Sequence, residues 1–236
     1  MSTVMSARSA RADEHRYFLA AAVVLTLLVL WAFSFEYRDL MHPGQFTVLV
    51  QMHGLVMFTW VGLFLTQVAL IAWQRPLWHR RLGVIGMALA FLVVALGVPT
   101  AVTASRLGGD HLPPGATPGG FLADAFTQLA AFALLAGSGL ALRRRPDVHK
   151  RLMLLSNMPP LIAATVRLVN FLHVDASGTT LRNLLVLAFI LVDALRTRRL
   201  HPALVIGGAC LIAADAADSA LAGTAVWAHV VRTLTA

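Results

Sequence analysis

Residues 82–105 read LGVIGMALAFLVVALGVPTAVTAS, an uninterrupted run of apolar and small residues that contains no charged side chain. An α-helix of this length extends about 36 Å at 1.5 Å per residue, enough to cross a hydrocarbon layer of about 30 Å. Similar apolar runs recur along the chain and predict seven helices, at about residues 17–37, 46–74, 82–105, 120–142, 151–173, 181–196 and 203–222. We therefore expect an all-α protein, a polytopic transmembrane helical bundle of about seven spans.

The composition favours a membrane protein without a separate soluble domain. Of the 236 residues, 58% are hydrophobic and 13% are charged, against about 25% charged in an average soluble domain. We expect one transmembrane domain, residues 1–236, with a polar N-terminus (1–16), a seven-span bundle (17–222) and a short C-terminal segment (223–236). This last segment either extends the seventh helix or lies at the outer interface as an amphipathic piece. The single cysteine, Cys210, excludes a disulfide within the chain.

The distribution of positive charge predicts the orientation of the bundle. Nineteen Lys and Arg against eleven Asp and Glu give a net charge of +8, but the cations lie in short loops and not on one basic helix face, which excludes nucleic-acid binding. Arg38, Arg106, Arg182 and Arg232 lie in the odd-numbered loops or at the C-terminus, and Arg167 lies within a span. The other 14 cations lie in the N-terminus and the even-numbered loops: Arg8, Arg11, Arg16, Arg75, Arg80, Arg81, Arg143, Arg144, Arg145, Lys150, Arg151, Arg196, Arg198 and Arg199. Because cytoplasmic loops carry an excess of Lys and Arg, the N-terminus is predicted to be cytoplasmic.

Two loops on the predicted cytoplasmic side carry a repeated motif. RPLWHRRL at residues 75–82 matches RPDVHKRL at residues 145–152 at five identical positions and one Arg/Lys exchange, with an offset of 70 residues. Each copy joins an outward-to-inward helix to an inward-to-outward one, as in a parallel repeat of helix pairs. The loop motif residues are expected either to orient the loops at the interface or to build a cofactor or anion site. These residues are His79, Arg80, Arg81, His149, Lys150 and Arg151.

The chain also resembles a group of uncharacterised bacterial multi-pass membrane proteins in which an H…Q…HRxxG unit precedes an HxRxM…R unit. The matching residues lie within about 46–170 and are His53, Gln67, His79, Arg80, Gly83, His149, Arg151, Met153 and Arg167. The resemblance implies a bacterial inner-membrane protein without an assigned reaction. A more distant likeness to b-type cytochrome bundles lies in the helical histidines, but the paired histidines that a dihaem bundle needs at two membrane levels are missing.

Polar side chains within the spans are the main functional clue. An ionisable group costs at least about 2.5 to 3.5 kcal/mol near the bilayer centre and persists there when it is paired, hydrated or functional. Counting residues along the predicted helices places the polar side chains of the spans that are named below, together with Asn183, within about 12 Å of the outer membrane boundary. The inner half of the bundle has no comparable set. We therefore predict an outward-facing polar pocket that binds a ligand, formed by His53, Asp124, Gln128, Arg167, Asn170, His173, Asp215 and Asp218.

Arg167 has the most specific predicted partners in this pocket. A guanidinium does not lose its proton, so we expect Arg167 to pair with Asp124, Asp215 or Asp218, either as a structural ion pair or as a clamp for a substrate anion. Asp215 and Asp218 lie on neighbouring helical turns. This spacing suits a proton relay or a cation site as well as simple pairing with Arg167.

Two further ionisable residues have simpler interpretations. His53 is interpreted as a ligand of haem or of a divalent metal, as a proton relay, or as a residue that hydrogen-bonds one helix to another. Asp193 lies beside Arg196 near the cytoplasmic end of its predicted helix. We interpret Asp193 as an interfacial charge.

Two backbone features complete the prediction. Asn157-Met158-Pro159-Pro160 interrupts the fifth span, because two consecutive prolines remove two amide donors. Such a break forms a hinge or lines a cavity. The last span carries small residues at helical spacing, Ala209, Ala213 and Ala217, which suit close packing against another helix.

Three function classes follow from these features. The first, which we favour, is a membrane protein whose outer pocket binds haem b, a divalent metal at His53 or a quinone. The second is a proton-coupled small-molecule carrier, and the third is a structural or assembly subunit that contacts another membrane protein through its last helix. Motifs of serine hydrolases, zinc proteases and Walker-type ATPases are missing from the sequence.

Overall fold

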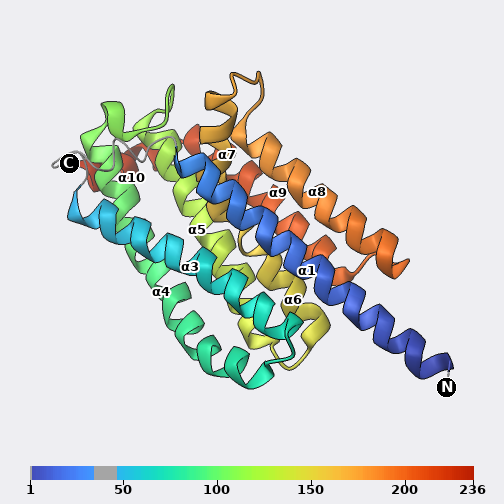
Figure 1. Cartoon of the computed structure of the whole chain (residues 1–236). Coiled ribbons are helices and arrows are strands. Elements are labelled where there is room, and N and C mark those ends of the chain that lie inside the picture. The colour runs from blue at the N-terminus through green and yellow to red at the C-terminus, as the bar shows by residue number, and fades with distance from the viewer. Residues whose placement is uncertain (1, 35–46) are drawn as a thin grey trace.

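The computed structural model of the chain describes residues 2–34 and 47–236, with the side chains of residues 2–12 and 110 left out. The described chain is helical (Figure 1). Its elements are α1 (Ser2–Ser34), α3 (Val48–Ala72), α4 (Pro76–Leu107), a 3-10 turn (Gly109–His111), α5 (Pro118–Ala141), α6 (Pro146–Leu155), α7 (Met158–Phe171), α8 (Gly178–Thr197), α9 (Pro202–Ala222) and α10 (Ala225–Thr235). Arg38 and the predicted end of the first span at residue 37 lie outside the described residues.

Among the described residues, seven helical segments are long and apolar enough to cross a membrane, which confirms the predicted all-α fold with about seven spans. They are Asp13–Ser34, Val48–Ala72, Pro76–Leu107, Pro118–Ala141, Pro146–Phe171, Gly178–Thr197 and Pro202–Ala222. The connections 73–75, 142–145 and 198–201 lie at one end of the bundle, which we call the arginine-rich end (Figure 1). The α4–α5 and α7–α8 connections and α10 lie at the opposite end.

Proline defines the start of several spans. α4 and α6 begin at Pro76 and Pro146, where a residue without an N–H group fits the first helical turn. The histidines and cations of the repeated motif therefore lie in the first turns of helices, and their prediction as loop residues is wrong. The hydropathy pattern places the start of these two helices at their first long apolar run, which is five or six residues after the proline where each helix begins.

α5 is the central helix of the bundle and packs against α4, α6, α7, α9 and α10. Leucine is the most frequent residue type in the buried core around it, which includes Leu135, Leu155, Leu204 and Leu211. α9 approaches α6 closely at Gly207, where an added Cβ would lie 2.5 Å from the Leu155 side chain. A small residue at this position therefore sets the distance between the two helices.

The predicted interruption of the fifth span is present between α6 and α7 and is closed by side chains of the bundle. Trp60 on α3 donates its indole N–H to Asn157 Oδ1 at 3.1 Å, and Asn157 Nδ2 donates to the carbonyl of Met153 at 2.8 Å. Trp60 and Asn157 are both buried. The Asn157 side chain at the break is thus hydrogen-bonded through both its oxygen and its nitrogen to protein groups, as the membrane interior favours.

The C-terminal segment is a separate helix and does not extend the last span. α9 ends at Ala222 with Gly223 as its C-cap, and the Thr224 hydroxyl accepts from Trp227 N to begin α10. Trp227 is buried against α5 and donates its indole N–H to the Gly119 carbonyl at 2.8 Å. On α9, Ala209 and Ala213 are exposed. Their docking against another membrane protein stays a prediction.

Candidate functional site

Two buried polar networks lie at different levels of α8. Arg182 lies near the start of α8, at the opposite end, and Asp193 lies near its finish, at the arginine-rich end. The two residues are separated by about 16 Å at 1.5 Å per residue. Both are almost completely buried, so each charge must be compensated by neighbouring helices.

The Arg182 network consists of Gln128, Arg182, Asn183 and Asp215, from α5, α8 and α9. The Arg182 side chain is 0% exposed and forms an ion pair with Asp215 through Nη2. It also donates to Gln128 Oε1 at 3.0 Å and to Asn183 Oδ1 at 3.2 Å. Asp215 accepts further hydrogen bonds from Gln128 Nε2 at 3.0 Å and Asn183 Nδ2 at 3.1 Å. Each side chain of the network is therefore bonded to at least two others.

Two more carboxyl groups lie beside this network. Asp124 is one turn before Gln128 on α5, and Asp218 is one turn after Asp215 on α9; both are partly buried. Asp124 interacts electrostatically with Arg182 and with both other carboxyl groups. Arg182 thus interacts with Asp215 and Asp124, and Asp218 is a third carboxyl group that interacts with both of these acids. Because charges interact strongly where the dielectric constant is low, the cluster needs a bound proton, a cation or water to balance its negative charge.

The expected pairing of Arg167 with Asp215 is wrong, because Arg182 is the partner of Asp215. Arg167 donates to the Ala163 carbonyl at 2.9 Å on its own helix, and its guanidinium lies 4.4 Å from the centre of the Phe33 ring. Sequence reasoning placed Arg182 in a loop because the apolar run starts at residue 181. The helix starts earlier, at Gly178, where the Ser177 hydroxyl accepts from Thr180 N. This Ser cap is a sequence signal that predicts the earlier start.

The other predicted pocket residues are not part of the Arg182 network. Asn170 and His173 are exposed at the finish of α7. His53 lies on α3, which packs against α1 and α4, and its Nδ1 is buried without a hydrogen-bond partner among the described residues. No group of three or more His, Cys, Asp or Glu side chains gathers as a metal site in the part of the chain that the structure describes. A metal at His53 stays a prediction.

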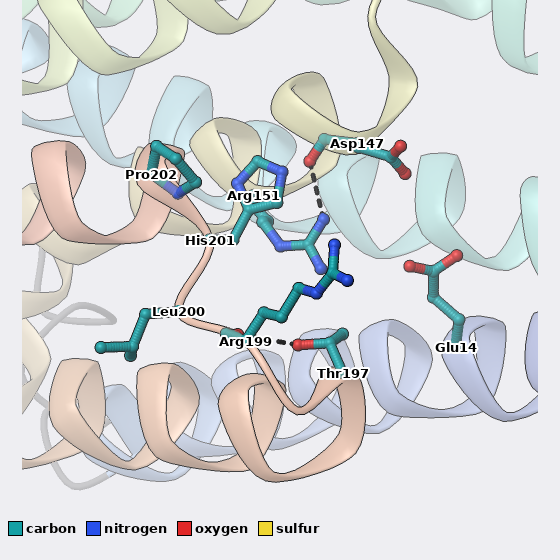
Figure 2. A pocket seen from close by; sticks show the side chains of 8 residues that line it. All are labelled: Glu14, Asp147, Arg151, Thr197, Arg199, Leu200, His201 and Pro202. Atoms are coloured by element: carbon teal, nitrogen blue, oxygen red, sulfur yellow. Dashed lines mark hydrogen bonds between the residues drawn. The ribbon is translucent and has the colours of Figure 1, made fainter.

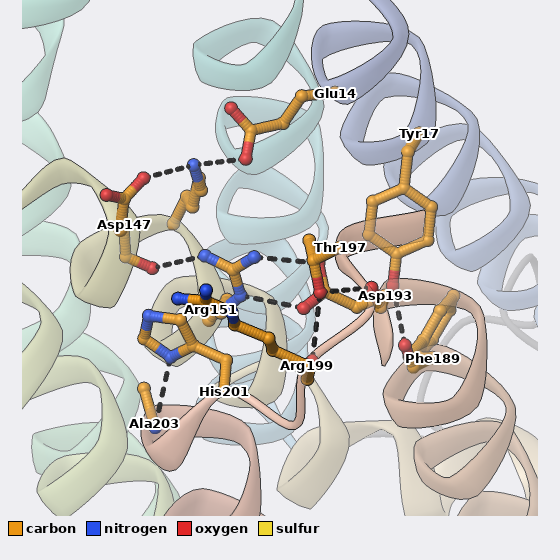
Figure 3. A network of polar contacts seen from close by, with 11 residues as sticks. Glu14, Tyr17, Asp147, Arg151, Phe189, Asp193, Thr197, Arg199, His201 and Ala203 are labelled. Carbon is orange, nitrogen blue, oxygen red and sulfur yellow. Dashed lines mark hydrogen bonds and ion pairs between the residues drawn. The ribbon is translucent and has the colours of Figure 1, made fainter. Parts of the chain in front are cut away.

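The Arg151 network lies at the arginine-rich end and consists of Glu14, Asp147, Lys150, Arg151 and Asp193 (Figure 3). Arg151 Nε and Nη2 donate to the two carboxylate oxygens of Asp193 at 3.0 and 2.9 Å, and the side chains are 3% and 1% exposed. Lys150 binds Glu14 at 2.5 Å and Asp147 at 2.7 Å. Asp193 is therefore not an interfacial charge. The expectation that the inner half holds no comparable polar set is also wrong.

Three consecutive residues of the repeated motif contact three different elements. His149 Nδ1 lies 2.8 Å from the Gly139 carbonyl on α5, Lys150 reaches α1, and Arg151 reaches α8. In the other copy, His79 Nδ1 lies 3.3 Å from the Gln67 carbonyl. The two histidine rings meet edge to face with their centres 6.2 Å apart. The two copies of the motif therefore join α4 to α6 at this end, whereas Arg80 and Arg81 are exposed.

A cavity of about 400 Å³ lies against the Arg151 network between α1, α6 and the α8–α9 connection (Figure 2). A second cavity, of about 320 Å³, adjoins it and shares Arg199 and Leu200. Burial and the nearby Arg151 guanidinium lower the pKa of His201 below its usual value. The first cavity is lined by Glu14, Asp147, Arg151, Thr197, Arg199, Leu200, His201 and Pro202.

Comparisons with known proteins give no match for this chain, whether to a protein family, to a curated protein or to a solved structure. The chemistry of the two networks is therefore the basis for a functional proposal.

Proposed function

We propose that this protein is a proton-coupled carrier of a small solute in the inner membrane of a bacterium, with its N-terminus in the cytoplasm. The observation that carries the proposal is the cluster of three carboxyl groups, Asp124, Asp215 and Asp218, at the buried guanidinium of Arg182, which pairs with Asp215. Ionisable groups inside membrane spans commonly form proton relays and coupling sites of transporters. This function is the second of the three expected classes.

Proton binding would change the partners of Arg182. With Asp215 ionised, Arg182 is held to α9, and the excess negative charge rests on Asp124 and Asp218. A proton on one of these carboxyl groups lowers that excess from two negative charges to one and lets a solute displace or share the hydrogen bonds of Gln128. The Arg182 network is thereby the proposed coupling site.

The two ion pairs suit alternate closure of the two ends. Arg151 with Asp193 links α6 to α8 at the arginine-rich end, and Arg182 with Asp215 links α8 to α9 nearer the opposite end. The fifth span is discontinuous: it is broken between α6, which carries Arg151, and α7. Discontinuous helices near the substrate site are a common feature of secondary transporters.

Uptake into proteoliposomes tests the proposal. Purified protein is reconstituted, a mixture of amino acids, organic acids, sugars and amines is added outside, and trapped solutes are measured by mass spectrometry with and without an inward proton gradient. We expect at least one solute class to accumulate with the gradient and not after a protonophore. No gradient-dependent accumulation of any class would contradict the proposal.

Isosteric variants connect this uptake to the carboxyl groups. Asp124→Asn and Asp215→Asn are expected to reduce gradient-driven uptake to the level of empty liposomes. Asp175→Asn, which changes an exposed carboxyl group in the α7–α8 connection, is the matched control and should keep full uptake. Equal uptake by all three variants would show that the Arg182 network is not the coupling site.

A redox cofactor is the second candidate function, and the buried, unpartnered Nδ1 of His53 favours it. The described residues do not fit a complete haem or metal site, because no group of three metal-binding side chains gathers there. Absorbance of the gently solubilised protein from haem-replete membranes tests this candidate. A Soret band that disappears in His53→Ala would support haem binding, and its absence from the wild-type protein would remove haem from consideration.

A further inference from the structure

Arg198 and Arg199 bring two positive charges to the adjoining cavities at the arginine-rich end, one more than the acids of the Arg151 network balance. Among the described residues, Glu14 and Asp147 pair with Lys150, and Asp193 pairs with Arg151. No ion pair of the Arg199 guanidinium is found in the same part of the chain. In both close-up views the Arg199 side chain points toward Arg151 (Figures 2 and 3). The Arg151 network and the two cavities thus hold four cations against three acids, and the surplus positive charge attracts an anion.

The adjoining cavity extends this charged site along an apolar helix surface. Besides the shared Arg199 and Leu200, it is lined by Leu191, Ala194, Leu195 and Arg198. Leu191 and Leu195 are 50% and 73% exposed in the last turns of a membrane-spanning helix. Leu191 and Leu195 lie one helical turn, about 5.4 Å, apart, and α8 ends at Thr197, just before Arg198 and Arg199. The charged and apolar parts are thus stacked along the membrane normal as the phosphate and acyl chains of a lipid are.

We propose that these two cavities together bind one anionic glycerophospholipid of the leaflet at the arginine-rich end. Its phosphate lies on Arg199 and Arg198, its headgroup enters the larger cavity, and one acyl chain lies along Leu195 and Leu191. Basic sites at the cytoplasmic ends of membrane helices recognise lipid headgroups in this way. The site is independent of the proposed transport function and would exist in a protein that moves no solute.

Binding to the detergent-solubilised full chain tests the site. Native mass spectrometry with dioctanoyl phosphatidylglycerol should detect one tightly bound lipid, and Arg199→Gln should weaken it about fivefold, the effect of about one interfacial cation. Arg144→Gln is the matched control, because Arg144 is an exposed cation at the same end outside both cavities. Equal weakening by both variants would overturn the proposal in favour of general surface charge.

A second pair of variants tests the apolar part. Leu195→Ser should weaken phosphatidylglycerol binding, whereas Leu187→Ser should not, because Leu187 is equally a lipid-facing leucine of α8 but lies outside the groove. Glycerol 3-phosphate, which has the phosphate without acyl chains, should bind much more weakly than the lipid. If it binds as tightly, or if Leu195→Ser changes nothing, the site takes a free phosphate ester and the lipid proposal is wrong.

Discussion

Arg151 and Asp193 form a two-point ion pair in a place where neither charge reaches solvent. The side chains are 3% and 1% exposed, and Arg151 also donates to the Asp147 carbonyl at 2.9 Å. A buried pair of this kind adds little net stability over a well-packed apolar pair, but the loss of one partner leaves an uncompensated charge. The pair therefore specifies how α6 and α8 meet.

Removal of Asp193 should consequently be costly. We expect Asp193→Ala to lower the free energy of unfolding by about 3 to 5 kcal/mol, measured by thermal or denaturant unfolding in detergent. The double variant Arg151→Met, Asp193→Leu should recover most of this loss, because it removes both charges and keeps the volume. Asp175→Ala, at an exposed carboxylate, should change the free energy by no more than about 0.5 kcal/mol. A double variant as unstable as the single one would contradict this account of the pair.

His201 predicts how the start of α9 responds to pH. Its Nδ1 accepts a hydrogen bond from Ala203 N at 3.2 Å, so the ring caps the helix only when Nδ1 is unprotonated. Burial and Arg151 lower the pKa of His201, so the folded protein binds this proton more weakly than the unfolded chain does. The stabilisation is present above the unfolded pKa of about 6.5 and is lost as pH falls through the folded value.

We therefore expect the melting temperature of the wild-type protein to fall between pH 7.5 and pH 5 by more than that of His201→Asn. Asparagine keeps a side-chain oxygen as the cap and does not titrate in this range. Differential scanning fluorimetry at matched ionic strength measures the difference. Identical pH profiles would show that His201 does not contribute.

At the scale of elements, helix contacts depend on a few glycines. A Cβ at Gly178, the first residue of α8, would lie 2.6 Å from the backbone N of Val166 on α7. Backbone atoms cannot move aside as a side-chain end can. Gly137 on α5, by contrast, has nothing within 4 Å of an added Cβ.

This contrast gives a matched pair of substitutions. Gly178→Ala should destabilise the protein by about 1 to 3 kcal/mol because the two helices must separate. Gly137→Ala should be neutral or stabilising by up to about 1 kcal/mol because alanine is the better helix former. Thermal unfolding of both purified variants decides the matter, and a larger loss for Gly137→Ala would contradict the packing described here.

The break in the fifth span shows how far local sequence predicts an element. Two prolines suffice to predict an interruption, since each removes a backbone donor wherever the chain places it. The residue that closes the break, Trp60, is 97 residues away along the chain from Asn157. Nothing in the local pattern selects it from the other tryptophans, because its position depends on how α3 packs.

For the whole molecule, the distribution of cations predicts which end faces the cytoplasm. In a Cys210→Ala background, Asp175→Cys at the opposite end should react with a membrane-impermeant maleimide on intact spheroplasts. Arg144→Cys at the arginine-rich end should react only after the membrane is opened. The reverse labelling pattern would contradict the predicted orientation.

Sequence patterns were enough to predict the all-α fold, about seven spans and the interruption of the fifth span. These properties follow from hydropathy, proline and local caps, all of which act within one helix. The pairing of Asp215 with Arg182 in place of Arg167, and the burial of Asp193 against Arg151, became visible only in the packed helices. Such partners depend on the rotation and contact of whole helices, because a buried charge is compensated by whichever group the packing brings within reach.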